Sequence, residues 1–260
     1  KGVWGYHPLV LSLANTGEPL YLVNRAGNCT SSQSAAAYFD RGIDLCLTAG
    51  FRAILLRGDT DFSQTEHLDR WDDRPEVRFV FGIDAMPNLV ALAEGLPEGL
   101  WQPLHRPAKY EVCTEPRQRP ENVKERIVQE RGYKNVRLQS EQVTEFDYRP
   151  TKCHKTYRIV VLRKNLSVAQ GQQRLFDEIR YFFYITNDRI ASAAAIVHLA
   201  NERCNQENLI AQLKNGVQAM RMPVDTLVSN WAYMVMASLA WTLKAWFALL
   251  LPVAGRWADK

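Results

Sequence analysis

The segment from Asn201 to Gly216 reads NERCNQENLIAQLKNG. It is a run of good helix formers with no internal proline, and the closing glycine is a typical helix stop. On a helix that turns about 100° per residue, Arg203, Glu207 and Lys214 are four and then seven positions apart and project from one face. We therefore expect a helix that presents one carboxylate between two cations.

This helix face has two interpretations. A carboxylate beside cations can ligate a metal ion while the cations hold phosphate groups. The face can also be an ordinary solvated one, in which Arg203 and Glu207 form a helix pair worth about 0.2–0.5 kcal/mol. Spacing alone favours the solvated face. Leu209 and Leu213 form an apolar pair on another side of the helix in either case.

The composition is that of an ordinary globular protein. The chain has 260 residues, of which 47% are hydrophobic and 23% charged, with a net charge of +4. This length allows one large domain or two smaller ones, and the mild charge permits an acidic partner without requiring one. The five scattered cysteines show no zinc-binding spacing, which predicts free thiols in a reducing compartment. The chain starts at Lys1 without an initiator methionine or a signal peptide, so we expect it to begin inside a longer protein.

One apolar segment, Trp231 to Ala254, is about long enough to span a bilayer. However, Lys244 lies in its middle, where a charge is costly in lipid, and Ser238 and Thr242 add polarity. We predict a helix buried in a large α/β core and no membrane association.

The first hundred residues alternate between strand and helix patterns. The order β-β-α-β-α-β-α predicts a mixed α/β layer. Ser32 or Ser34 is expected to cap the first helix, and Ser63 the second. The expected strands are Tyr6–Leu13, Pro19–Asn24, Arg52–Arg57 and Val77–Ile83, and the expected helices include Ala35–Leu47 and Pro87–Gly95.

The basic charge is concentrated in residues 105–164, which hold 15 Lys and Arg against 8 Asp and Glu. This segment also contains short β-type runs: Lys134–Leu138, Val143–Tyr148 and Tyr157–Leu162. A β-rich insertion exposed to an anionic polymer has this composition. A solvated region whose charge has no partner has it too, and the sequence does not separate the two.

Asp59 follows an apolar strand and a glycine. A carboxylate at a strand end, on the rim of an α/β sheet, lies where such folds place ligands. Phosphodiester chemistry with two divalent metal ions needs several converging carboxylates, and Glu207 is 148 positions away along the chain. Asp61 is the local competitor, and either aspartate can be a simple turn or cap residue. The histidines show no metal or triad spacing, and no Gly-rich phosphate loop is present.

With both ends in view, the chain resembles the DDE transposases of bacterial insertion sequences, in the subgroup with a β-rich insertion before the last catalytic Glu. Arg57 to Phe62 (RGDTDF) is similar to the family's second-Asp motif at a strand end. Arg203, Glu207 and Lys214 match the Arg-x3-Glu-x6-Lys part of its signature. The apolar helix after Pro223 completes the similarity, which spans essentially the whole chain.

The resemblance implies an α/β fold: a ribonuclease-H-like mixed sheet with flanking helices, interrupted by a β-rich insertion domain. Residues 1–100 would be the first part of the core, 101–180 the basic insertion, and 181–260 the helical return with the catalytic Glu. Asp59 and Glu207 would be the second and third metal ligands, holding Mg²⁺ (or Mn²⁺). Arg203 and Lys214 would contact transposon-end DNA.

Two departures from the family pattern stand out. The signature begins with a Tyr three residues before Arg203, and this chain has Ala200 there. The first catalytic Asp lies on a first strand upstream of the segment matching Gly5 to Leu9, and no Asp precedes Asp40. We expect a catalytic-domain fragment with an incomplete metal site.

The implied function is metal-dependent DNA cleavage and strand transfer at insertion-sequence ends. The expected partners are transposon ends and target DNA, with a possible homodimer on DNA, in the bacterial cytoplasm and nucleoid. Two alternatives remain: a related metal-dependent nuclease without strand transfer, and a non-catalytic DNA-binding remnant.

Overall fold

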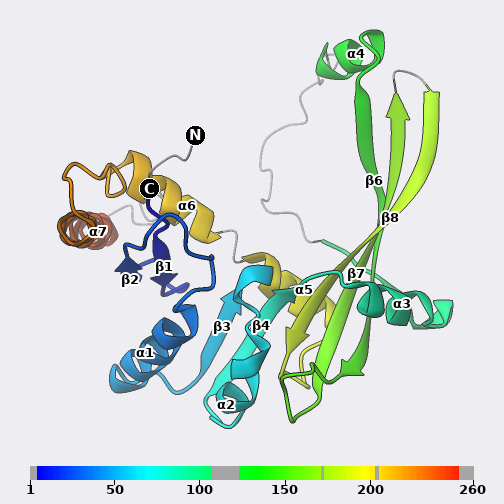
Figure 1. The fold of residues 1–260 in the computed structure, drawn as a ribbon. Helices are drawn as coiled ribbons and strands as arrows, with labels where there is room; N and C mark the ends of the chain where they lie inside the picture. Colours follow the sequence, from blue (N-terminus) through cyan, green and yellow to red (C-terminus); the bar gives the residue numbers. More distant parts are fainter. Residues whose placement is uncertain (1–4, 107–122, 171–172, 203–204, 252–260) are drawn as a thin grey trace.

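A computed structural model describes residues 5–106, 123–170, 173–202 and 205–251 (Figure 1). The strands are β1 (Leu9–Ser12), β2 (Pro19–Val23), β3 (Ile54–Gly58), β4 (Val77–Ile83), β5 (Gln102–Pro103), β6 (Lys134–Tyr148), β7 (Tyr157–Gln170) and β8 (Gln173–Thr186). The α-helices are α1 (Ala35–Thr48), α2 (Leu68–Asp72), α3 (Pro87–Glu94), α4 (Val123–Glu130), α5 (Ala193–Asn201), α6 (Asn205–Asn215) and α7 (Leu227–Leu249). The predicted mixed α/β class is confirmed.

The strands form one large mixed sheet and one separate hairpin. The large sheet has the order β3-β4-β8-β7-β6-β5, in which β3 and β4 are parallel and the other pairs antiparallel. The predicted hairpin is observed as β1 paired with β2. The short β runs expected in the basic segment are continuous strands of 14 and 15 residues that extend the same sheet as β3 and β4.

Helices cover both faces of the large sheet. Alternate residues of β4 point to opposite sides, so Phe79 and Phe81 pack with α1, α2 and α3 in one apolar cluster, while Val80 packs with α5 in another. Trp71 of α2 is fully buried in the first cluster, and its ring makes an edge contact with the Phe39 ring of α1. This layering fixes β3 and β4, and with them the loop that begins at Asp59.

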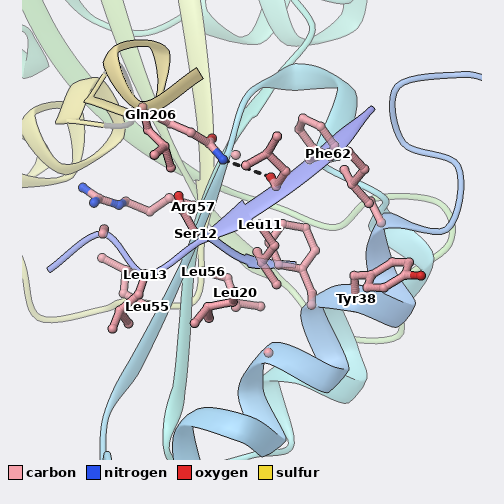
Figure 2. A pocket seen from close by; sticks show the side chains of 18 of the residues that line it. Leu11, Ser12, Leu13, Leu20, Tyr38, Leu55, Leu56, Arg57, Phe62 and Gln206 are labelled. Carbon is pink, nitrogen blue, oxygen red and sulfur yellow. Dashed lines mark hydrogen bonds between the residues drawn. The ribbon is translucent and has the colours of Figure 1, made fainter. Parts of the chain in front are cut away.

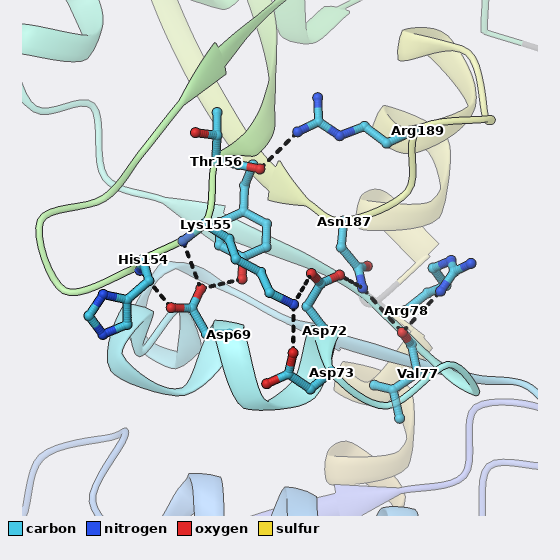
Figure 3. A network of polar contacts seen from close by, with 11 residues as sticks. Asp69, Asp72, Asp73, Val77, Arg78, His154, Lys155, Thr156, Asn187 and Arg189 are labelled. Carbon is cyan, nitrogen blue, oxygen red and sulfur yellow. Dashed lines mark hydrogen bonds and ion pairs between the residues drawn. The ribbon is translucent and has the colours of Figure 1, made fainter.

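Strands β6, β7 and β8 continue beyond the helix-covered part of the sheet as an arm, with α4 near its tip (Figure 1). At the other end of these strands, a polar network fastens the β6–β7 connection to α2 (Figure 3). The Asp69 carboxylate accepts hydrogen bonds from the Tyr157 hydroxyl at 2.6 Å and from the backbone N–H of His154 at 2.6 Å. Lys155 donates to Asp72 at 2.8 Å and to Asp73 at 2.7 Å.

Burial and polarity act together on this network. Burial raises the pKa of the Tyr157 hydroxyl, and the hydrogen bond to the Asp69 carboxylate raises it further. Partial burial raises the pKa of Asp69, but the hydrogen bonds it accepts outweigh that effect and leave the pKa below its ordinary value. The ionised carboxylate of Asp69 is therefore the form that accepts these hydrogen bonds.

Three local predictions were wrong. Ser34 precedes α1 with a left-handed backbone (φ 63°) and makes no side-chain cap hydrogen bond. Ser63 caps no helix; it ends a 3₁₀ turn, Thr60–Phe62, that Asp59 caps instead. The segment expected as one helix from Asn201 is split, since α5 ends at that residue and α6 starts at Asn205.

The predicted burial of the long apolar helix was also wrong. Only one side of α7 is covered: its buried residues are Asn230, Met234, Ser238 and Trp241. On the opposite side Met236 is 63% exposed and Phe247 64% exposed. Within the described residues α7 is the one helix long and apolar enough to cross a membrane, judged by length and composition alone.

Candidate functional site

A groove separates the two sheets. Every residue of β1 and of β3 lines it, and its volume is about 590 Å³ (Figure 2). Its floor includes Phe39 and Ile43 of α1, and α6 contributes Gln206 and Glu207. We call this feature the β1–β3 groove.

The walls of the groove are two strand edges. Among the described residues, β1 pairs with β2 and β3 pairs with β4, so each strand turns its other edge to the groove. On the β1 side, the Val10 carbonyl accepts a hydrogen bond from the Gln206 side chain at 3.0 Å (Figure 2). On the β3 side, Ile54 donates to Glu76 next to β4, so the backbone groups of Leu55 and Arg57 are directed the other way.

Asp59 lies where β3 ends and the groove begins. Its Oδ1 accepts a hydrogen bond from the Asp61 N–H at 3.2 Å, which caps the 3₁₀ turn Thr60–Phe62. Gly58 makes this turn possible, since a Cβ there would stand 2.8 Å from Phe62 Cβ and 3.0 Å from Phe81. The cap role that the sequence left open for Asp59 is thus observed, and the same carboxylate also lines the groove.

Glu207 reaches the groove from the first turn of α6. Leu209 and Leu213 bury the opposite side of this helix against Trp241 of α7, as the apolar pair predicted. Trp241 Nε1 also donates to Gln212 Oε1 at 2.8 Å. These contacts leave Glu207 exposed and lining the same groove as Asp59, although 148 positions separate them in the sequence.

The two predicted DNA contacts have different outcomes. Lys214 is exposed in the last turn of α6 and does not line the groove. Seven positions at about 1.5 Å each place it roughly 10 Å along the helix from Glu207. Arg203 lies outside the described residues. Ala200, where the family has Tyr, is 4% exposed, and its small side chain lets α5 pack closely on the sheet.

Arg57 and Gln206 are site residues that the sequence analysis missed. Arg57 Nη1 donates to the Leu199 carbonyl at 3.0 Å and to Glu202 at 2.7 Å. Gln206 adjoins Glu207 and binds β1. A polar side chain on an otherwise apolar strand was the available signal for Arg57, but no spacing rule connects it to the helices 142 and 145 positions away.

The oxygen ligands that the groove offers suit a hard divalent cation such as Mg²⁺. Asp59, Asp61 and Glu207 all line it. However, no three His, Cys, Asp or Glu side chains in the described part of the chain lie close enough together to hold a metal ion. The donor chemistry therefore fits the ion, while the number of converging carboxylates is short of a complete site.

The basic segment is anchored by ion pairs. Arg106 and Lys164 both pair with Glu141, at 2.9 and 3.2 Å, and Arg163 pairs with Glu98 at 3.0 Å. These pairs hold the arm together and to the body. Toward the tip, exposed cations that include Lys124, Arg131 and Lys134 extend the basic surface.

The fold is a mixed α/β sheet flanked by helices, and carboxylates from a strand end and a distant helix line one groove. The sequence model of the family described as transposase DDE domain group 1 matches residues 1–259. The chain therefore belongs to the DDE transposase domain family. A comparison with curated proteins found no match.

Proposed function

We propose that this chain is the catalytic domain of a bacterial insertion-sequence transposase, with Asp59 and Glu207 as two of its metal ligands. The observation that carries the proposal is the β1–β3 groove, which both of these carboxylates line although 148 positions separate them in the sequence. Family membership supports the reaction class: DNA strand cleavage followed by strand transfer.

The groove also supports an incomplete ribonuclease-H-like core. A further strand between β1 and β3 would join the two sheets, since both edges offer backbone groups to it. Gln206 now supplies a side-chain substitute for one such bond, at the Val10 carbonyl. An aspartate on this strand, near the Asp59 end, would complete a set of three carboxylates. We propose that the first catalytic Asp comes from such a strand in a longer form of the protein.

Asp59 and Glu207 would hold Mg²⁺ or Mn²⁺ through their carboxylate oxygens. When bound, the ion supplies Lewis acidity toward a phosphodiester and the oxygen that attacks it. The residues of this chain orient the ligands: the 3₁₀ turn fixes Asp59, and α6 carries Glu207. The basic arm and Lys214 are proposed as the DNA-facing surfaces, because phosphate contacts dominate affinity. The same proposal places the protein in the bacterial nucleoid, where it acts as a dimer that binds two transposon ends.

The test compares this chain with a version extended upstream through one more strand. Each is incubated with DNA that carries the ends of the element, with and without Mg²⁺. Cleavage by the extended protein alone supports both the function and the missing strand. Joined DNA products would distinguish a transposase from a nuclease, which gives nicks only. Cleavage by the short chain would show that Asp59 and Glu207 are the wrong pair.

The second candidate is a non-catalytic DNA-binding remnant. It is favoured by the lack of a three-carboxylate cluster within the described residues. A remnant binds DNA in both versions, short and extended, and cleaves with neither. Glu207→Ala separates the two candidates in the extended protein, because it abolishes cleavage by a transposase and leaves DNA binding by a remnant unchanged.

A further inference from the structure

We propose that Arg57 is a positioning residue, whose guanidinium fastens the end of α5 to β3 and thereby sets where Glu207 stands relative to Asp59. The inference rests on the proposed function for the identity of the two carboxylates. It adds a residue that neither touches the metal ion nor belongs to the sequence motif around Glu207.

The contacts of Arg57 join two distant parts of the chain. Its Nη1 donates to the Leu199 carbonyl at 3.0 Å and to Glu202 Oε2 at 2.7 Å. Leu199 lies in the last turn of α5, whose final carbonyls have no partner within the helix, and Glu202 is the C-cap residue. A cation is also favourable at this end of a helix. Arg57 therefore closes the C-terminus of α5.

The location of this contact matters more than its strength. Arg57 is two residues before Asp59, and Glu202 is five residues before Glu207. Since β3 is extended and Asp59 keeps an extended backbone (φ −81°, ψ −169°), side chains two positions apart leave the same side of the chain. The contact thus joins the two segments close to both proposed ligands, on the side of β3 that carries Asp59.

Apolar packing places α5 on the large sheet, but it does not place the start of α6 there. The buried residues of α5 belong to the cluster on the large sheet, whereas Leu209 and Leu213 of α6 belong to a separate cluster with α7. The start of α6 is bound to β1 through Gln206. Arg57 ties the end of α5 and Glu202, which lead into α6, to the strand of Asp59.

An ion pair with one solvent-exposed partner contributes little to stability, so global unfolding is a poor readout. The Arg57 side chain is 15% exposed and that of Glu202 56% exposed. Residues that orient metal ligands without touching the metal typically change its affinity 10- to 100-fold. The affinity for the metal ion is therefore the property that a positioning role of Arg57 should change.

The experiment titrates Mn²⁺ into the full chain and follows free Mn²⁺ by electron paramagnetic resonance. We expect Glu207→Ala to remove binding and Arg57→Ala to weaken it about tenfold. Arg57→Lys should recover most of the affinity, because both bonds come from one nitrogen that an ammonium can replace. The matched control is Arg74→Ala, which breaks the Arg74–Asp44 pair (2.8 Å) on the other side of the core.

Glu202→Ala provides a second variant that removes one of the two Arg57 bonds without altering β3, and it should weaken Mn²⁺ binding in the same direction. If Arg57→Ala binds Mn²⁺ as Arg74→Ala does, while Glu207→Ala still removes binding, the positioning role is wrong and the site stands. If Glu207→Ala leaves Mn²⁺ binding unchanged, or the parent chain binds none, both the site assignment and the inference fail.

Discussion

Replacing Asp69 tests how firmly the β6–β7 connection is held to α2. Asp69→Ala removes the acceptor of the Tyr157 hydroxyl and of the His154 N–H, each 2.6 Å away. Tyr157 is 1% exposed, so water does not replace the lost acceptor. A buried hydroxyl left without a partner costs about 1–3 kcal/mol. Because His154 is exposed, its N–H finds water.

We expect Asp69→Ala to lower the free energy of unfolding by about 2–3 kcal/mol, or Tm by about 4–12 °C for a chain of this size. Tyr157→Phe removes the hydroxyl itself and should cost about 1 kcal/mol. The double variant should then cost about 1–2 kcal/mol less than the sum, because the two groups share one hydrogen bond.

Urea unfolding followed by circular dichroism measures these differences, provided that the slope with urea stays constant. The matched control is Asp73→Ala, which removes one exposed carboxylate from Lys155 and should change stability by less than about 1 kcal/mol. Strict additivity of Asp69→Ala and Tyr157→Phe, or an Asp69→Ala effect no larger than that of Asp73→Ala, would refute the reasoning.

Three further predictions concern pH, DNA and the long helix. Burial raises the pKa of Asp69, but the hydrogen bonds it accepts lower the pKa by more, so the net pKa is below its ordinary value. The contribution of Asp69 to the free energy of unfolding is therefore present above about pH 4 and lost as pH falls. Urea melts of the parent and Asp69→Asn should converge below that pH. Lys134→Gln at the arm tip should reduce the slope of log affinity for DNA against log salt by about 0.9, whereas the ion-paired Lys152→Gln should not. Asn230→Ala should cost about 2 kcal/mol in thermal unfolding, because it removes two hydrogen bonds, of 3.1 and 2.6 Å, that this fully buried amide makes with the Val224 N–H and carbonyl.

Elements with strong local patterns could be predicted from the sequence. Val77–Ile83 is rich in aromatic and β-branched residues and is observed as β4 with the same bounds. The turn signal after Leu13 placed the β1–β2 hairpin correctly. In both cases residues close in sequence carry the information, since a strand's own side chains decide that it is half or fully buried.

Longer-range features could not be predicted in this way. The runs Lys134–Leu138 and Val143–Tyr148 read as separate strands because polar residues lie between them, yet cross-strand pairing with β7 carries β6 through this gap. The burial of α7 was misjudged for a related reason. A helix apolar on every side has no periodicity that tells which side meets the core, so length and hydropathy suggested burial that only four of its residues have.

For the candidate site, the residues that carry carboxylates were easier to predict from the sequence than the fact that they line the same groove. A strand followed by Gly58 and Asp59 indicates a carboxylate on the rim of a sheet, and the structure places it there. Helix spacing put Glu207 opposite the buried Leu209, which is also observed. That both carboxylates line one groove depends on α6 packing against α7 and on Gln206 binding β1. None of these contacts leaves a local trace in the sequence.

The β1–β3 groove combines two strand edges, unpaired among the described residues, with two of the carboxylates that the sequence analysis singled out. A sheet edge that faces water is normally shortened, charged or covered. Here two edges face each other across an apolar groove, and one of their carbonyls accepts a side-chain hydrogen bond from Gln206. No Asp precedes Asp40 in the chain, while two carboxylates already stand at the groove. Under the proposed function, a single added strand would satisfy the edges and fill the groove, and an aspartate on it would join the two carboxylates, which is why the extended protein is the decisive form to assay.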